Sequence, residues 1–301
     1  MIEINGQTQL LGIIGWPVEH SLSPTMHNAA FAALGLNWVY LPLSVPPGRV
    51  EAALRGLLAL GFRGANVTVP HKQAVMSHLD HITEAAQAIG AVNTLVVEED
   101  GRLTGDNTDG AGFLAALREA GFEPQGRRAL VLGAGGAARA VVYALATAGA
   151  QVTVLNRTSS RAEALIQHLA PAVPPSSLSS QLLHREILAE EATHADLLVN
   201  TTPVGMWPHV EGSPWPDDLP LPSHLTVFDL VYNPLETQLL RQARRADART
   251  IGGLGMLVHQ GALAFELWTG RLPPLEMMRA ACERVLTTGE AQNCLDAGSV
   301  V

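Results

Sequence analysis

The chain has 301 residues, of which 47% are hydrophobic and 16% are charged, and its formal net charge is -9. This length and balance allow about two globular domains with buried cores, and the acidic charge disfavours nucleic acid as a partner. No apolar run approaches the roughly 20 residues that span a bilayer, the residues after Met1 lack a secretory signal, and two cysteines, Cys282 and Cys294, are too few for a disulfide framework. We therefore expect a cytoplasmic protein without a membrane partner.

The first part of the chain, from Leu10 to about Asp106, alternates short apolar strands with helical segments, which is typical of an α/β domain. Repeats of this kind predict right-handed crossovers and parallel strand pairing. Gly35 and Gly61 end the first two predicted helices. The predicted strands are residues 10–15, 38–43, 65–69 and 92–97, and the predicted helices are residues 24–34, 49–61 and a run around 71–79.

The second part of the chain begins after a predicted helix at residues 109–121, which we expect to bridge the domains, and opens with a strand, helix and strand at 128–155. Further buried strands are predicted at 196–200 and 227–231, and further helices at 255–269 and 275–286. Two segments rich in proline and serine, 171–180 and 207–222, are expected to be surface loops. Residues 289–301 are expected to form a loose tail.

A glycine-rich turn follows the predicted strand at residues 129–132. Gly133 would allow a tight turn, Gly135 would let the backbone approach a pyrophosphate, and Gly136 would open a helix whose free N–H groups attract an anion. The third glycine of the usual dinucleotide pattern is replaced by Ala138, a permitted variant. Because this turn lies between a predicted strand and a predicted helix, it predicts a dinucleotide-binding fold.

The tip of the next strand carries basic residues where an NAD-selective fold has a carboxylate. Asn156, Arg157 and Thr158 occupy the tip, and Arg161 follows one turn later. A guanidinium can bind the 2′-phosphate of the adenosine ribose, so Arg157 and Arg161 indicate NADP rather than NAD. The alternative is that these arginines are surface residues at a helix N-terminus without a ligand. The helix dipole disfavours cations there, which makes this alternative less attractive.

Polar residues follow the predicted strands of the first part. Ser21 and Ser23 precede a helix and could either cap it or bind a ligand, and we expect both roles. Asn66 and Thr68 share one face of a strand by the two-residue period, and Lys72 lies just beyond the end of that strand. Ligands of open α/β sheets bind at such strand ends.

The same region contains a candidate acid–base pair. Asn93 begins another predicted strand, and Asp109 stands in a polar turn that ends the domain. Hydroxyl and amide groups of this kind suit a polyol ring with a carboxylate, while reduction of a ketone needs one group that gives a proton to the oxygen. Lys72 is the natural candidate, and Asp109 would hold it in place and bind a substrate hydroxyl.

Metal-ligand spacing is nearly absent from the sequence. The nearest approach is His78, Asp80 and His81 in a predicted helical segment, and a solvated helix face explains these residues better than a metal site. We expect no bound metal.

The chain resembles the shikimate dehydrogenase family through motifs that occur in the same order as in that family, from residue 12 to about 270. In the first part these are HSLSP at 20–24, NVTVPHK at 66–72, GAVNT at 90–94 and GDNTDG at 105–110. In the second part they are GAGGA at 133–137, NRT at 156–158, NTTPVGM at 200–206, DLVYNP at 229–234 and GLGMLVHQ at 253–260.

The resemblance implies NADPH-dependent, reversible reduction of 3-dehydroshikimate to shikimate, a step of chorismate and aromatic amino acid biosynthesis. Lys72 and Asp109 would be the catalytic pair. The further implied substrate contacts are Ser21, Ser23, Asn66, Thr68, Asn93, Tyr232 and Gln260. The implied cofactor contacts are Glu84, Gly133, Ala134, Gly135, Gly136, Ala137, Asn156, Arg157, Thr158, Arg161, Thr201, Leu230, Gly253 and Met256.

The resemblance also implies two domains. Residues 1–109 would form an α/β substrate-binding domain, residues 110–253 a Rossmann-like NADP-binding domain, and helices within 254–301 would pack back on the first domain. Three alternatives stay open: a related enzyme that also accepts quinate, often with NAD; a sensor that binds shikimate or NADP without turnover; and a different enzyme on a similar two-domain fold. The presence of Arg157 disfavours the first, and the presence of both Lys72 and Asp109 disfavours the second. A monomer and a homodimer are both possible.

Overall fold

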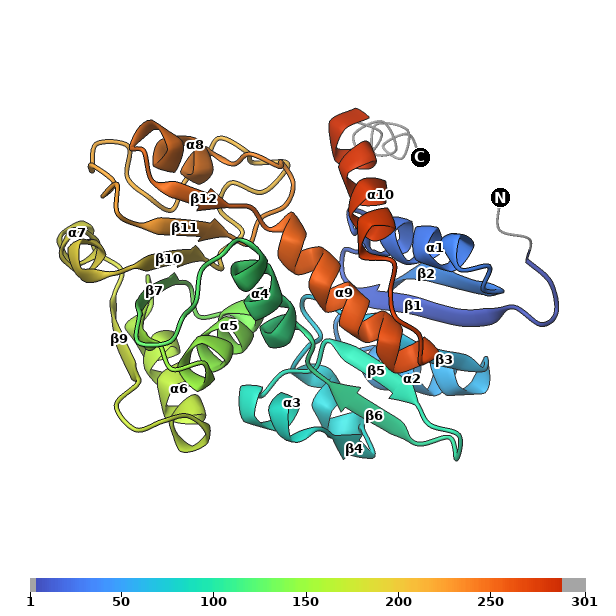
Figure 1. Ribbon diagram of the computed structural model, residues 1–301. Coiled ribbons are helices and arrows are strands. Elements are labelled where there is room, and N and C mark those ends of the chain that lie inside the picture. The colour runs from blue at the N-terminus through green and yellow to red at the C-terminus, as the bar shows by residue number, and fades with distance from the viewer. Residues whose placement is uncertain (1–3, 289–301) are drawn as a thin grey trace. The chain divides into compact units, whose positions relative to one another are not determined.

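The structure, a computed structural model, describes residues 4–288, and these divide into two compact units (Figure 1). The first unit comprises residues 4–108 and 258–288, and the second comprises residues 109–257. Each unit contains one six-stranded sheet with helices packed against it. The predicted α/β class with two domains is therefore confirmed. None of the helices within residues 4–288 has the length and apolar character needed to cross a bilayer.

The sheet of the first unit is mixed rather than wholly parallel. Its strand order is β2-β1-β3-β5-β6-β4; β1 pairs in parallel with β2 and β3, whereas β5 is antiparallel to β3 and β6. The expectation of parallel pairing is wrong for β5, and for its pairing with β6 the reason is that a short turn joins the two strands, whereas a parallel crossover needs a dozen or more residues. The strands are β1 Gln9–Gly15, β2 Trp38–Ser44, β3 Phe62–Val67, β4 His81–Ile82, β5 Thr94–Val97 and β6 Leu103–Asp106.

Helices cover the first sheet with separate sets of apolar residues. Helix α2 buries Val50, Leu54 and Leu57, which lie one and two turns apart and pack on the strands through one cluster. Helix α1 packs against α10, and both helices belong to the first unit (Figure 1). The helices are α1 Ser23–Ala33, α2 Val50–Ala59, the 3-10 helix Ala74–His78, α3 Glu84–Ile89, α9 Leu254–Thr269, which enters this unit at Val258, and α10 Leu275–Thr288.

An aromatic cluster joins the C-terminal helix α9 to the first sheet. The ring of His27 on α1 stacks on Tyr40 of β2 with centroids 4.5 Å apart, and Phe265 and Trp268 of α9 lie beside it. The indole N–H of Trp268 donates to the carbonyl of Leu95 on β5 (2.8 Å). The implied return of the C-terminal helices to the first domain is thus confirmed for residues up to 288, and the predicted tail, 289–301, lies outside the described residues.

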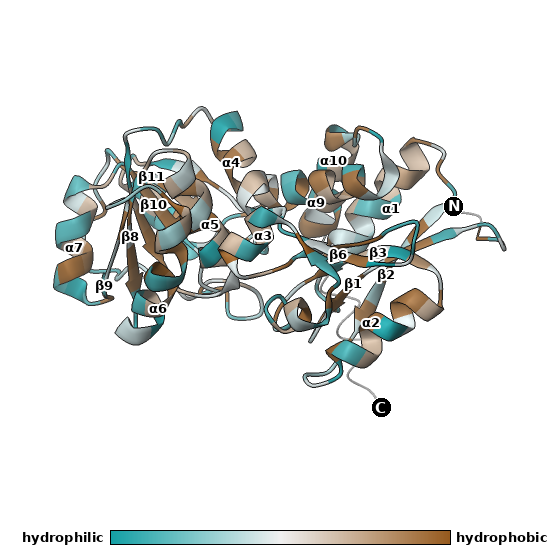
Figure 2. Ribbon diagram, turned by 90° about the horizontal axis from the view of Figure 1, so that it is seen from below, coloured by the Kyte–Doolittle hydropathy of each residue, from teal (hydrophilic) through white to brown (hydrophobic). Residues whose placement is uncertain are grey.

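The sheet of the second unit is parallel throughout, in the order β12-β11-β10-β7-β8-β9. Its central strands are among the most hydrophobic segments of the chain (brown in Figure 2), as expected for a sheet covered on both faces. The strands are β7 Arg128–Leu132, β8 Gln151–Asn156, β9 Leu178–Leu182, β10 Leu197–Asn200, β11 Thr226–Asp229 and β12 Arg249–Ile251.

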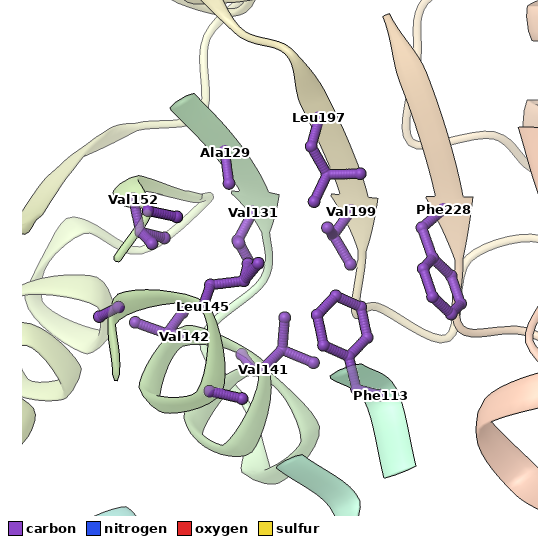
Figure 3. Packing of buried hydrophobic residues seen from close by; sticks show 14 of the residues in the cluster. Phe113, Ala129, Val131, Val141, Val142, Leu145, Val152, Leu197, Val199 and Phe228 are labelled. Carbon is purple, nitrogen blue, oxygen red and sulfur yellow. The ribbon is translucent and has the colours of Figure 1, made fainter. Parts of the chain in front are cut away.

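Alternate residues of these strands enter two different cores. Val131 and Val199 pack with Phe113 of α4 and with α5 and α6 (Figure 3), whereas Leu130 and Leu198 pack with α7 and α8 on the opposite face. The helices are α4 Asp109–Glu119, α5 Gly136–Thr147, α6 Ser159–Leu169, the 3-10 helix Ala170–Ala172, α7 Arg185–His194 and α8 Gln238–Arg245.

Three local predictions are wrong. The predicted surface loop at 171–180 contains the first residues of β9, which completes the sheet beside β8. The proline-rich segment 207–222 is not wholly a surface segment, since Trp215 is 2% exposed and its indole N–H donates to Leu219 O (2.8 Å). His78, Asp80 and His81 share no helix face, because the helical turn ends at His78. Among residues 4–288 there is no group of three or more His, Cys, Asp or Glu side chains that could hold a metal.

Candidate substrate and cofactor sites

The turn from β7 to α5 contains backbone N–H groups that have no backbone acceptor in the described part of the chain. Gly133 has φ +108, and a Cβ at this position would lie 2.7 Å from Thr201 Oγ1, so both backbone and space require glycine. Its N–H donates to Leu155 O at the end of β8 (2.9 Å). The first backbone bond of α5 runs from Arg139 N–H to Gly135 O, so the N–H groups of residues 136–138 have no backbone acceptor among residues 4–288. Such a helix start binds phosphate.

The rest of the turn lets α5 pack closely on the sheet. Ala138, at the third position of the glycine pattern, is fully buried in the core that α5 shares with the strands. Gly135 precedes the helix and is exposed, while Ala134 and Ala137 are half-buried. The small side chains leave the turn open at the carboxyl edge of the sheet, where ligands of parallel α/β sheets bind.

Two arginines at the tip of β8 carry unbalanced positive charge. Arg157 follows β8 directly and Arg161 lies in the first turn of α6; both are exposed, and within residues 4–288 neither forms an ion pair. Asn156 braces the tip by donating from Nδ2 to Thr158 O (2.9 Å). No carboxylate occupies residues 156–161. Free cationic groups at this place fit the 2′-phosphate of NADP and leave the diol of NAD without an acidic partner.

A buried polar cluster that was not predicted holds the ends of β10 and β11 together. Asp229 is fully buried and accepts hydrogen bonds from Asn200 Nδ2 (2.8 Å), Val231 N–H (3.1 Å) and Thr237 Oγ1 (2.6 Å). Burial raises the pKa of the Asp229 carboxyl to about 6, against the lowering effect of these bonds. Asn200 and Asp229 are register partners in adjacent strands, which is the signal that could have revealed the pair.

This cluster positions two residues of the implied cofactor site. Thr201 follows Asn200 and donates from its hydroxyl to Leu132 O (2.7 Å), beside the glycine turn. Leu230 follows Asp229, and its N–H donates to Asn200 O (3.0 Å). Gly253 and Met256 are buried at the start of α9 in the same unit. Glu84, by contrast, is exposed at the start of α3 in the first unit.

In the first unit, a network of buried amides and hydroxyls joins the end of β3 to the start of β5. Asn66 is 4% exposed; its Oδ1 accepts from the Tyr40 hydroxyl (2.6 Å), and its Nδ2 donates to Asn93 O (3.1 Å) and Thr94 Oγ1 (3.2 Å). Burial raises the pKa of Tyr40, whose hydroxyl also bonds to Ser23. Because both Nδ2 hydrogens of Asn66 are used inside the protein, this side chain braces the network rather than facing outward.

The network extends to the C-terminal helix through Asn93. Its Oδ1 accepts from Thr108 N–H (2.8 Å), and its Nδ2 donates to Thr108 Oγ1 (2.9 Å) and to Gln260 Oε1 on α9 (3.4 Å). The structure therefore brings together Asn66, Asn93 and Gln260, although 167 positions separate Asn93 from Gln260. Thr94 and Thr108 belong to the same network and were not predicted as site residues. The pairing of Thr94 with Asp106 in β5 and β6 places Thr94 beside the segment that contains Thr108, and this pairing could have indicated both residues.

The two serines before α1 have different positions. Ser21 is half-buried, and its hydroxyl accepts from Ser23 N–H (3.3 Å) within the turn before α1. Ser23 is the first residue of α1 and is 4% exposed, so it does not cap the helix, and Pro24 stands second rather than first. The N-cap of α1 is Leu22 and carries no side-chain cap, so the expected capping role is wrong for both serines.

Thr68 and Lys72 lie just beyond the end of β3. Thr68 follows the strand instead of belonging to it, because β3 ends at Val67, and it is half-buried. No residue in the described part of the chain hydrogen-bonds to its hydroxyl. The backbone of Lys72 is held next to the amide and hydroxyl network, because Lys72 O accepts a hydrogen bond from Val92 N–H (2.8 Å), and Val92 precedes Asn93. Lys72 is half-buried.

The remaining predicted substrate residues belong to the second unit. Asp109 is the first residue of α4 and is 5% exposed, and it follows Thr108 directly in the chain. A carboxylate in the first turn of a helix is stabilised by the helix dipole. Tyr232 is half-buried, three residues after the end of β11.

Three protein families match successive parts of this chain. The shikimate dehydrogenase substrate binding domain matches residues 13–95, the shikimate / quinate 5-dehydrogenase family matches residues 116–206, and the shikimate 5′-dehydrogenase C-terminal domain matches residues 253–283. The matches cover both units and include the glycine turn, Lys72 and Gln260.

Similar proteins cover almost the whole chain. A shikimate dehydrogenase (NADP(+)) of Moorella thermoacetica is 56% identical over 279 residues, which are 92% of this chain and 94% of that protein. A shikimate dehydrogenase solved in complex with NADP+ is 41% identical, with a TM-score of 0.87, and covers 94% of this chain and 98% of its own. The enzyme of Thermus thermophilus, solved with NADP(H) and shikimate, is 43% identical with a TM-score of 0.83, covering 93% of this chain and 100% of its own. With family matches in both units and this identity over nearly its full length, the chain belongs to the shikimate dehydrogenase family.

Proposed function

We propose that this chain catalyses the reversible reduction of 3-dehydroshikimate to shikimate with NADPH. The observation that carries the proposal is the pair of unpaired arginines, Arg157 and Arg161, beside a helix start with free N–H groups, because this arrangement suits a dinucleotide with a 2′-phosphate. The solved relatives described above bind NADP and shikimate. The product, shikimate, feeds chorismate and aromatic amino acid biosynthesis.

Substrate binding and NADP binding are assigned to two parts of the chain whose limits lie within a few residues of those of the two units. We assign substrate binding to residues 1–109 with the helices within 254–301, and NADP binding to residues 110–253. Ser21 offers a hydroxyl just before α1 and Thr68 offers one just after β3. The network of Asn66, Asn93 and Gln260 holds the end of β3 and the start of β5 in place. These groups suit the hydroxyls and carboxylate of a small cyclic acid.

When bound, NADPH supplies the hydride for the ring ketone. Lys72 gives a proton to the ketone oxygen as it becomes a hydroxyl, so that the ketone, one hydride and one proton yield the alcohol. Asp109, fixed at the start of α4, binds a substrate hydroxyl and supports the protonated Lys72. In the reverse direction Lys72 accepts the same proton from shikimate.

The rival function within the family is activity on quinate, since one of the matching families is named for both acids. The arginines at the tip of β8 favour NADP and thereby the shikimate-specific function. A sensor without turnover is disfavoured because Lys72 and Asp109 are both present and both are at least half-buried. We keep the cytoplasm as the proposed location and a monomer or homodimer as the proposed assembly.

The test is an assay of the purified chain with shikimate or quinate, each with NADP or NAD, followed by the absorbance of the reduced cofactor. We expect turnover with shikimate and NADP, at least about tenfold higher in kcat/KM than with either alternative. Equal or higher turnover with quinate and NAD would replace the proposal by the rival function. Binding of shikimate and NADP by calorimetry without turnover would identify a sensor.

A further inference from the structure

We propose that Gly15 is a positioning residue for the substrate, because its missing side chain makes room for the methyl group of Thr68 and so sets the direction of the Thr68 hydroxyl. Gly15 ends β1 and is buried, and Thr68 follows the neighbouring strand β3. A Cβ added at Gly15 would lie 2.3 Å from Thr68 Cγ2 and 3.3 Å from Val69 O. The inference rests on the proposed function, in which Thr68 contacts shikimate.

The two backbones cannot move apart easily to relieve such a contact. Thr68 N–H donates to Ile14 O (2.9 Å), and Trp16 N–H donates to Val69 O (3.0 Å). These bonds lie on either side of Gly15 and hold the strand ends together. The φ of Gly15 lies outside the left-handed region, so an alanine would be acceptable to the backbone, and its main cost would come from the collision with Thr68 at 2.3 Å, with a smaller one from Val69 O at 3.3 Å.

The collision is relieved most directly by rotation of the Thr68 side chain. Cγ2 is attached to Cβ, so the methyl leaves Gly15 only if χ1 moves to another staggered position, about 120° away. The hydroxyl moves with it, because both groups are fixed to the same carbon. At present the hydroxyl has no hydrogen-bond partner among residues 4–288, as expected for a group kept for a ligand.

Other glycines of the first unit do not share this arrangement. Gly56 also has a φ outside the left-handed region, and a Cβ there would meet nothing within 4 Å. Gly12 lies on the same strand as Gly15, but its Cβ would meet Leu43, a residue of the apolar core. Gly15 is therefore the glycine of β1 whose space is occupied by a candidate substrate residue.

The experiment compares Gly15→Ala, Thr68→Ser and the double variant, with Gly56→Ala as the matched control. Thr68→Ser removes the methyl and keeps the hydroxyl, so it supplies the reference KM for the double variant. We expect Gly15→Ala to raise the KM for shikimate about tenfold, the loss of one well-placed hydrogen bond, with the KM for NADP unchanged. The KM of the double variant for shikimate should lie within about twofold of that of Thr68→Ser, because the methyl that collides with the new Cβ is gone. If the two substitutions acted independently, the double variant would instead keep the full rise in KM caused by Gly15→Ala.

Several outcomes would overturn the inference. An unchanged shikimate KM in Gly15→Ala, or a double variant as impaired as Gly15→Ala, shows that the methyl contact does not position the hydroxyl. If Gly15→Ala does not fold, the double variant decides: a folded protein with the KM of Thr68→Ser supports the contact, and an unfolded one contradicts it. Failure of the proposed function is distinguished by the unmodified chain, which would then not turn over shikimate.

Discussion

The candidate sites of the two units are built from different parts of the chain. In the second unit the groups that fit a dinucleotide are backbone N–H groups of one turn and two exposed arginines, all within residues 133–161. In the first unit the candidate substrate site is held by buried side chains from five separate segments. Hydrogen bonds join these side chains, which are Tyr40, Asn66, Asn93, Thr108 and Gln260. A local backbone site can therefore be recognised from a short motif, whereas a network of side chains exists only once the fold has formed.

The largest effect that would sharpen this comparison is expected at Gly133. Gly133→Ala should lower the affinity for NADP about 100-fold, because the new Cβ meets Thr201 Oγ1 at 2.7 Å and alanine is strained at φ +108. The control is Gly126→Ala, at φ +72 with nothing within 4 Å, which adds the backbone strain alone. Calorimetric titration with NADP measures both. Equal losses in the two variants would show that the shape of the turn is unimportant for binding.

The next effect concerns the arginines at the tip of β8. Replacement of Arg157 and Arg161 together by alanine should raise the KM for NADP about 30-fold and leave the KM for NAD unchanged, because only NADP carries the 2′-phosphate. Arg118→Ala, which removes an exposed arginine paired with Glu123, is the matched control. A rise for both cofactors, or for neither, would contradict the assignment of NADP selectivity to this tip.

The two units are also expected to respond to acid in opposite directions, and His27 of the first unit has the larger effect. Burial among aromatic rings lowers the pKa of His27 to about 3, with Asn66 opposing the shift only in part. The unfolded chain binds a proton below about pH 6.5 while the folded chain does not, so stability falls as pH falls. His27→Phe should remove about 2 kcal/mol of the loss in unfolding free energy between pH 7 and pH 5, measured by urea titration at both pH values. An unchanged pH dependence would show that His27 accepts a proton in the folded state.

Asp229 of the second unit has the opposite sign and a smaller effect. Its folded pKa of about 6 lies above the ordinary aspartate value of 3.8, so the folded chain binds the proton first and stability rises as pH falls through 6. Asp229→Asn should therefore abolish a gain of about 1 kcal/mol between pH 7 and pH 5. The same urea titrations check it, with Asp196→Asn, at a partly exposed carboxyl paired with Arg127, as the control. A gain that persists in Asp229→Asn would assign it to another group.

The strongly periodic or apolar elements could be predicted from sequence, and so could the motif residues. Strands β1, β2, β7, β8 and β10 and helices α1, α2, α5 and α9 lie within a few residues of their predicted ranges. Helix α6 entered only through the alternative interpretation of Arg157 and Arg161 as residues at a helix N-terminus, and helices α3, α7 and α8 and strands β4 and β6 were missed. So were β9 and β12: β9 has the sequence LSSQL and is ordered by pairing with β8, and β12 has only three residues. Tertiary pairing decides such weak segments.

The parts of the sites that could not be predicted depend on contacts between distant residues. Asp229 looks like an ordinary polar residue until the register of β10 and β11 sets it beside Asn200. The expected role of Asn66 as a substrate contact stays a prediction, and the structure adds that both of its amide hydrogens are already used. Gly15 likewise gains a role only when β3 places Thr68 against it.

Lys72→Ala, in a combined rate and binding measurement, tests whether the first unit supplies the proton while the second binds NADP. We expect kcat for shikimate oxidation to fall by about 100-fold to 10,000-fold, the usual contribution of a positioned acid–base group, while calorimetry shows NADP binding unchanged and shikimate still bound. A variant that keeps its kcat would show that Lys72 does not transfer the proton, and one that loses NADP affinity would show that the first unit also takes part in binding NADP.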